Sequence, residues 1–388
     1  MKKQLVIGLG LAVIAAPAFA SKARLQALGE STNGSFFIQD NRNVFLNAAE
    51  VNNNKDLVTL EWGSGKTTDT DTAPNAEGGV IKSINNMVYG IHLGRTTSFN
   101  NTLNTFTTTG AGAVTPYAAS NTVDVFVGGD AGMKWGANLT WAQSNDDAYT
   151  PVAAGTAGKA EAKSLDLNLG VQMGDLAAYV KGGILGQASA KDAAGVKAVD
   201  LKRKHELEIG ASYKVTDYTV FAQVNNNKFD DKAAANADIK GTSAQVGVAR
   251  TEKLNDKTMA FVKLSGQWSK VEGLNAAGTA ATANNETKTI AVPVSVGMEH
   301  DAASWLTLRG SVGQNLWSKQ DDDATKKRTI ANSTNVNAGA TLKFGDLSVD
   351  GVVGTGNNGA GNIAATNQEV GVLSLDNLMT RVSMTYRF

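Results

Sequence analysis

The stretch that decides the fold is Met379–Phe388, which reads MTRVSMTYRF. Its alternate residues Val382, Met384, Tyr386 and Phe388 are apolar, and the residues between them are polar or charged. Alternation with a period of two places one kind of side chain on each face of a β-strand. Chain ends usually fray in water, so a regular strand that ends on an aromatic residue needs an apolar phase beside one face.

The same stretch resembles the closing strand of Gram-negative outer-membrane β-barrels, which carries a terminal Phe and an aromatic residue two positions earlier. The resemblance implies that Tyr386 and Phe388 form the signal read by the barrel-assembly machinery. In such barrels the apolar face contacts lipid and the polar face lines the lumen. An ordinary edge strand of a soluble β-protein is the alternative interpretation.

Residues 1–20 have the features of a secretory signal peptide. Met1-Lys2-Lys3 is positively charged, Leu5–Ala16 is apolar, and Ala18-Phe19-Ala20 is a small-x-small cleavage site. We expect cleavage after Ala20, with an uncleaved anchor helix as the alternative. No later segment contains the roughly 18 apolar residues that a spanning helix needs, so membrane insertion would have to use strands.

Composition argues against several classes of function. The chain has 36 Lys+Arg and 36 Asp+Glu, and removing Lys2 and Lys3 leaves 34 against 36, so nucleic acid is not an expected partner. Cysteine is absent, and the three histidines have no spacing typical of a metal cluster or a catalytic triad. We therefore expect no enzymatic activity, no cofactor and no metal site.

Segments of about 9 to 12 residues alternate throughout the chain, and this is the length with which a tilted strand crosses a bilayer. Clear examples are Met133–Trp141, Ser164–Met173, Ile290–Met298 and Val336–Phe344. Short and long connections follow one another in turn. The short ones are predicted turns at Asn85-Asn86, Gly129–Ala131, Gly174-Asp175, Val215–Asp217, Asn255-Asp256, His300–Ala302 and Gly345-Asp346. The long ones are predicted loops near 64–78, 99–121, 144–161, 188–202, 229–239, 271–287, 318–327 and 356–367.

This order predicts an all-β, transmembrane, antiparallel up-and-down β-barrel over residues 56–388, with short periplasmic turns and long extracellular loops. The count is about 16 strands, or about 14 without the turn at Asn85-Asn86. The closing strand is expected to pair with Leu57–Trp62, antiparallel if the strand number is even.

Charged residues lie out of phase with the apolar face and are predicted to face the lumen. Two interpretations stay open: the charges line an aqueous channel, or they pair with one another across a plugged lumen. The pore-lining candidates are Asp124, Lys134, Asp166, Glu206, Glu208, Lys263, Arg309 and Arg381.

General porins narrow their barrel with an infolded third loop, and the third long loop here begins near Asp146 and Asp147. By position, these two residues are candidates for the acidic side of a constriction, with Lys134, Arg309 and Arg381 on the basic side. The second loop, 99–121, has no charge and is expected to latch onto a neighbouring subunit, as in trimeric porins, or to lie over the rim.

Residues 21–55 do not alternate. Asp40, Phe45, Asn47 and Ala49 have a spacing similar to the amino-terminal segment of the long-chain fatty-acid transporter family, in which an Asp precedes an aromatic residue and Asn-Pro-Ala. Ala48 stands where that family has proline. The resemblance implies a plug inside a 14-stranded barrel, with Asp40, Phe45 and Asn47 as plug residues. A periplasmic leader or a short helix at the barrel mouth is the alternative.

The same segment, together with Leu57–Trp62, resembles outer-membrane proteins of deltaproteobacteria such as the Bdellovibrio group. The sequence thus predicts a protein of the cell outer membrane that contacts lipid and acts as a porin for passive diffusion of small hydrophilic solutes and ions. Monomer and homotrimer stay open. The alternatives are a plugged barrel that transports hydrophobic compounds and a structural or adhesive surface barrel.

Overall fold

The computed structural model describes residues 21–62, 76–105, 118–149, 158–191, 195, 197–232, 237–273, 286–322, 328–329, 334–355 and 378–388. The predicted signal peptide, 1–20, lies outside the described residues, as do large parts of the predicted loops.

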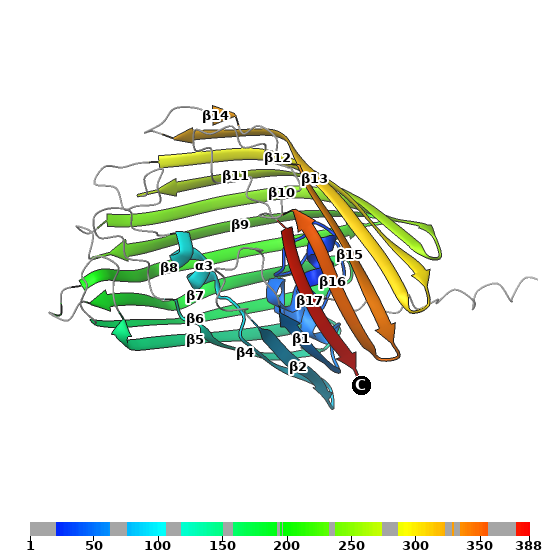
Figure 1. Ribbon diagram of the computed structural model, residues 1–388, viewed down its shortest axis with the longest axis horizontal. Coiled ribbons are helices and arrows are strands. Elements are labelled where there is room, and N and C mark those ends of the chain that lie inside the picture. Colours follow the sequence, from blue (N-terminus) through cyan, green and yellow to red (C-terminus); the bar gives the residue numbers. More distant parts are fainter. Residues whose placement is uncertain are drawn as a thin grey trace, which may run out of the picture.

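Antiparallel strands form one closed ring (Figure 1). Of the 17 strands in the described residues, the two-residue β14 pairs only with β13, and the other 16 pair in chain order around the barrel. The strands are β1 (Leu57–Trp62), β2 (Glu77–Ile84), β3 (Met87–Leu93), β4 (Asn121–Asp130), β5 (Lys134–Tyr149), β6 (Gly158–Met173), β7 (Leu176–Lys191), β8 (Lys197–Val215), β9 (Tyr218–Asp231), β10 (Ala237–Asn255), β11 (Thr258–Glu272), β12 (Glu286–Ala303), β13 (Leu306–Asp322), β14 (Arg328–Thr329), β15 (Asn335–Phe344), β16 (Leu347–Thr355) and β17 (Leu378–Arg387).

The closing strand pairs as the sequence predicts. In the antiparallel pairing of β1 with β17, Leu57 lies opposite Arg387 and Trp62 lies opposite Val382. The prediction of 16 strands is confirmed, and the 14-strand alternative is wrong because β2 and β3 form a hairpin.

The two faces of β17 also have the predicted environments. Ser383 and Thr385 are fully buried inside the barrel, whereas Tyr386 and Phe388 are 46% and 51% exposed on its outside. An apolar outer surface is stable against lipid, where backbone groups must be satisfied by a closed sheet.

The predicted strand lengths are too short on one side of the barrel. Strands β5 to β13 contain 14 to 19 residues and run well into the stretches predicted as long loops. Both faces of a strand are hydrated outside the bilayer, so its hydrogen-bond ladder continues there without apolar alternation.

Most predicted turns are at the expected positions. Asn85 and Thr216 have φ angles of 54° and 53°, in the left-handed region that Asn tolerates and tight hairpins require. The turn predicted at His300–Ala302 is wrong, because β12 continues to Ala303 and the chain reverses at Ser304-Trp305. The turn predicted at Gly129–Ala131 is likewise shifted, because β4 includes Asp130.

Residues 21–55, called the luminal segment from here on, contain the helices α1 (Lys22–Ala27) and α2 (Asn43–Leu46) and the 3₁₀ helix η1 (Ala48–Asn52). Figure 1 shows this blue segment enclosed between β15–β17 in front and the green strands behind. A further helix, α3 (Ser98–Thr105), follows β3. None of the described helices is long and apolar enough to cross a bilayer.

Candidate functional site

The luminal segment contacts the inner wall around almost the whole ring. Its side chains or backbone bind or stack on residues of β1, β2, β6, β7, β9, β11, β12 and β13. It also packs against β3, β4, β5, β15, β16 and β17. Most of its residues are buried. The barrel cross-section is therefore filled at this level.

Arg42 joins the segment to the first two strands. Its Nη1 lies 2.8 Å from Glu61 Oε2 on β1 and 2.6 Å from Glu77 Oε1 on β2. Its Nε donates to the carbonyl oxygen of Thr32 at 2.8 Å. The Lys22 ammonium adds a second contact to Glu77 Oε1 at 2.5 Å. Two cations thus neutralise two buried carboxylates.

Arg24 makes a corresponding connection to β12. Its guanidinium binds Glu299 on β12 through two parallel hydrogen bonds of 2.8 and 2.9 Å. The Nη1 atom also lies 3.1 Å from Asp40 Oδ2. Glu299 in turn accepts from Arg309, which pairs with Asp350 on β16 at 3.0 Å. Planar guanidinium groups suit such two-pronged contacts with carboxylates.

The 3₁₀ helix η1 fits against glycines of the wall. Asn47 caps η1 by accepting from Ala49 N at 3.0 Å, and its amide donates to the carbonyl oxygens of Val171 and Ala178. A side chain at Gly136 or Gly170 would collide with η1, since a Cβ at Gly170 would lie 1.8 Å from Asn47 Oδ1. Absence of a side chain at these two positions lets the segment approach the wall.

Aromatic rings of the segment pack against rings of the wall. The guanidinium groups of Arg42 and Arg95 lie 4.3 and 4.7 Å from the centroid of the Phe45 ring. Phe36 stacks on Phe221 of β9, with ring centroids 4.9 Å apart. Phe37 contacts Phe261 of β11 edge-on, with ring centroids 5.2 Å apart. Cation–π and ring contacts therefore add to the ion pairs.

Burial shifts the acidity of two groups in the segment. Burial raises the pKa of Asp40 to about 6, although the neighbouring Arg24 guanidinium acts in the opposite direction. Burial also raises the pKa of Glu50, which accepts hydrogen bonds from Asn53 and Gln172. Both shifts favour the protonated carboxyl inside the barrel.

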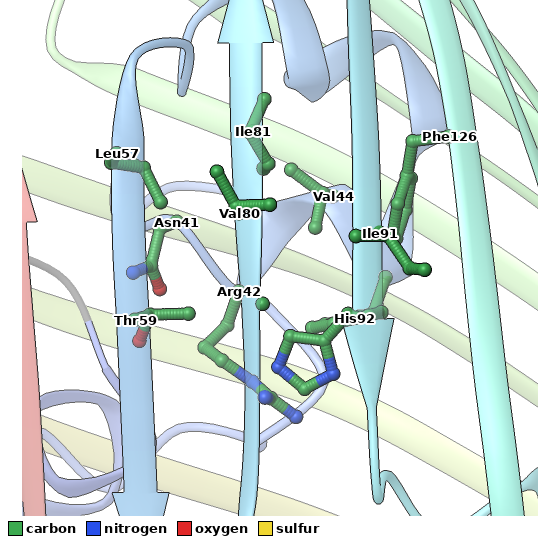
Figure 2. A pocket seen from close by; sticks show the side chains of 12 residues that line it. Asn41, Arg42, Val44, Leu57, Thr59, Val80, Ile81, Ile91, His92 and Phe126 are labelled. Carbon is green, nitrogen blue, oxygen red and sulfur yellow. The ribbon is translucent and has the colours of Figure 1, made fainter.

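Two cavities border the segment. The smaller, drawn in Figure 2, lies between Arg42, Phe45 and His92 and the inner faces of β1–β4. Its volume of about 20 Å³ is enough for about one water molecule and not for a solute. The larger, of about 1280 Å³, lies on the side of the short turns and is lined by Phe36, Phe37 and the turn residues. It forms a vestibule below the luminal segment.

The three predicted plug residues, Asp40, Phe45 and Asn47, all lie at contacts inside the barrel, as given above. Among the predicted pore-lining residues, six are in ion pairs: Lys263 with Glu30, Arg309 with Glu299 and Asp350, Asp124 with Arg95, Asp166 and Glu206 with Arg203, and Glu208 with Lys181. The charges of the lumen face therefore pair with one another and with the segment.

The predicted constriction is not assembled. Asp146 and Asp147 belong to β5, which continues because its pairing with β6 persists there, so the expected infolded loop is wrong for both. Asp147 contacts Lys159 at 3.1 Å with both side chains about three-quarters exposed, at 74% and 75%. Lys134 lies at the turn end of β5 and donates to Asn53 at 2.5 Å. Arg381 lies on β17, near the Arg42 cluster, and is partly buried.

The second loop also differs from its prediction, since α3 lies inside the barrel. Phe99 and Leu103 of α3 are buried in an apolar cluster on the inner wall, and Asn100 exchanges two hydrogen bonds with the backbone of Ala119. The wall members of the cluster are mainly small: Ala142, Ala160, Ala162, Ala188, Ala190, Val199, Leu201, Phe229 and Ile239. This described part of the loop narrows the lumen and neither latches outward nor lies over the rim.

Sequence reasoning missed Arg24, Arg42, Arg95 and Arg203, which neutralise most of the inner carboxylates. A signal was available: Arg24 and Arg42 occur in the non-alternating segment, and Arg95 lies just before the charge-free loop, beside a wall with many inward carboxylates. The histidines form no cluster, and no group of three metal-ligating side chains occurs among the described residues.

No known family pattern and no curated relative matches the chain. It is similar to solved outer-membrane structures at low identity. OmpT, an outer-membrane protein of Vibrio cholerae, is 14% identical over 86% of this chain and 97% of its own, with a TM-score of 0.36. Salmonella typhi OmpF is 14% identical over 86% and 96%, with a TM-score of 0.37. A Pseudomonas aeruginosa FadL homologue is 11% identical over 95% and 98%, with a TM-score of 0.41.

The chain is an outer-membrane β-barrel. Its closed ring of 16 strands and its apolar outer face place it in the cell outer membrane. The finer function depends on the filled lumen.

Proposed function

We propose that this chain is a transport barrel closed by its own luminal segment, so that solutes cross only when this segment rearranges. The observation that carries the proposal is the set of contacts that residues 21–55 make around the ring, with Arg24 buried in an ion pair with β12 and Arg42 in ion pairs with β1 and β2. A buried ion pair is costly to break because each partner left alone is a desolvated charge.

Two other functions would each require a different lumen from the closed one proposed here. An open diffusion porin is the second candidate, because inner side chains of β9–β11 are partly exposed above the segment. Transport of hydrophobic compounds is less well supported, since the described apolar cluster of the lumen is already covered by Phe99 and Leu103 of α3. The expectation that the barrel is not an enzyme stays a prediction.

Conductance in planar bilayers tests the proposal with full-length proteins. The Arg24→Ala/Arg42→Ala variant should conduct at least tenfold more than the wild type, because Asp40 and Glu61 lose their arginine partner while Glu77 and Glu299 each lose one of two cations. A cysteine pair at Gly29 and Ser311, where a Cβ on residue 29 would lie 3.5 Å from the Ser311 Cβ, should hold the end of α1 against β13. Since the native chain has no cysteine, this pair is the sole source of a disulfide.

Added to the double-arginine variant, the disulfide should suppress conductance until a reductant is supplied. Heat-modifiable migration on a gel shows that each variant is folded. Deletion of residues 21–50 gives the conductance of a barrel that lacks most of the luminal segment. Steady ohmic steps of that size from the wild-type chain would contradict closure, and the absence of conductance from every folded variant would favour a structural or adhesive role.

A further inference from the structure

On β9, β10 and β11, the inner wall above the luminal segment is lined by uncharged polar side chains rather than by ion pairs. Phe221 of β9 stacks on Phe36 of the luminal segment. One row farther from the periplasmic turns, Gln223 lies opposite Gln245, and Gln245 lies opposite Gln267. Three carboxamides therefore stand side by side on neighbouring strands.

The next row repeats this chemistry with shorter side chains. Asn225 lies opposite Ser243, and Ser243 lies opposite Ser269. We call the two rows the amide face, defined as Gln223, Gln245, Gln267, Asn225, Ser243 and Ser269. Strands in a sheet are about 4.8 Å apart, so each row spans about 10 Å of wall.

The amide face is exposed inside the barrel. Gln267 is exposed and the other five residues are half-buried, whereas inner residues at the level of the luminal segment, such as Glu61 and Asp350, are buried. Among the described residues, no partner hydrogen-bonds the carboxamides of Gln245 and Gln267. These groups are therefore available to a solute.

Charges beside the amide face are already neutralised. Glu206 and Glu208 of β8 border it, and they pair with Arg203 at 2.8 Å and with Lys181 at 2.8 Å. The exposed residues of α3, such as Asn101, are uncharged as well. A solute on this side of the lumen thus meets hydroxyl and amide groups rather than a charged ring.

We propose that the amide face binds neutral, multiply hydroxylated solutes, of the carbohydrate or polyol class, before they pass the luminal segment. A carboxamide both donates and accepts hydrogen bonds, as does a hydroxyl group, so the two chemistries match without net charge. A wall without a charged ring gives no preference for cations or anions. This assignment rests on the proposed transport function, of which it names the substrate class.

Block of ion current by a neutral oligosaccharide tests the assignment. Maltohexaose added on the extracellular side of the full-length Arg24→Ala/Arg42→Ala variant should reduce its current in a saturable manner. Adding Gln245→Ala and Gln267→Ala should weaken binding and therefore raise the half-blocking concentration of maltohexaose at least fivefold. Unsaturable block, or the same half-blocking concentration in both proteins, would overturn the assignment.

Ion selectivity gives an independent readout with a matched control. In the Arg24→Ala/Arg42→Ala background, Gln267→Glu adds one negative charge to the amide face and should raise the K⁺ over Cl⁻ permeability ratio at least threefold over that of the background. Lys240→Gln changes the net charge equally on the outer face of β10 and should leave the ratio unchanged. Equal shifts in both variants would show that the amide face does not border the path.

A failure of the proposed transport function remains distinguishable. If the double-arginine variant does not conduct, closure by the luminal segment is wrong, yet calorimetric titration of the wild-type protein with maltohexaose still examines the amide face. If the wild-type protein binds maltohexaose and the Gln245→Ala/Gln267→Ala variant does not, the amide face is supported as a carbohydrate site. If the wild-type protein does not bind maltohexaose, that assignment is refuted.

Discussion

Two arginines attach the luminal segment to the barrel. Arg24 reaches β12, and Arg42 reaches both β1 and β2. Both guanidinium groups are almost fully buried, so their pairs are little screened by salt, unlike the exposed Lys159–Asp147 pair.

Replacing Arg42 with Ala should loosen the segment. Glu61 and Glu77 would lose a buried partner, and breaking such a pair costs about 3–5 kcal/mol. Trypsin cleavage within residues 21–55, followed by mass spectrometry, should become at least tenfold faster. Lys159→Ala removes a cation from an exposed pair and should leave the cleavage rate unchanged. Equal rates in wild type and Arg42→Ala would contradict this role of Arg42.

Acid should tighten the attachment of the segment. The pKa of Asp40 is about 6 inside the barrel and 3.8 ordinarily, so the docked state binds a proton more strongly than the released state. This contribution is fully present below pH 3.8 and is lost as the pH rises through 6. Proteolysis of the segment by an acid-tolerant protease should therefore be slower at pH 4.5 than at pH 7. The difference should shrink in Asp40→Asn, and an unchanged difference would assign the effect to other groups.

The face of each inner charge could be read from the sequence, but its partner could not. Period-two alternation gives the side of the strand on which Asp124, Glu208 or Arg309 lies. It does not give the height in the barrel, which depends on the register of neighbouring strands. The Arg24–Glu299 contact joins residues 275 positions apart, and no local pattern marks so distant a pair.

At the scale of elements, alternation identifies the part of a strand that faces lipid and not the whole strand. β8 and β10 each contain 19 residues, far more than their apolar stretches require. The sequence of Asp146 and Asp147 looks like a loop because it is polar, yet the β5–β6 ladder continues through this region. The Gln row of the amide face lies between exposed apolar outer residues such as Val224 and Val246, so alternation gives its face but not the register that brings its members side by side.

The fit of η1 against β6 can be tested with a single methyl group. Gly170→Ala places a Cβ 1.8 Å from Asn47 Oδ1, so η1 must move, and conductance should rise severalfold. Gly351→Ala is the matched control, because nothing lies within 4 Å of its added Cβ. Identical conductance of both variants would mean that η1 does not obstruct the path.

At the scale of the whole molecule, the closed ring determines behaviour in detergent. Each of the 16 strands pairs with a neighbour on both sides, so the ring has no open edge, which gives such barrels high resistance to detergent. The protein should migrate differently on a gel before and after boiling and should show β-rich circular dichroism in detergent micelles. A monomer that stays soluble without detergent would refute the membrane barrel.

The sequence predicted the barrel well and the state of its lumen poorly. Short-range alternation and turn residues determine strand number, topology and the two faces, and these were correct. Whether inner charges line a channel or pair across it depends on contacts between distant segments, so both interpretations stayed open. The partial resemblance around Asp40, Phe45 and Asn47 pointed to the lumen, although Ala48 departs from it.

The position of the Arg42 cluster has a consequence for the order of assembly. β1 is the strand at which the ring closes, and it holds only six paired positions with β17 and five with β2. Arg42 binds one carboxylate on β1 and another on β2, directly behind this short seam. Residues 21–55 must therefore be in place when the first and last strands meet. If a nascent barrel closed before this segment was in place, Glu61 and Glu77 would be buried without Arg42 at the β1 junction. That cost would drive the junction to reopen. Insertion of the luminal segment and closure of the barrel are therefore a single kinetic step.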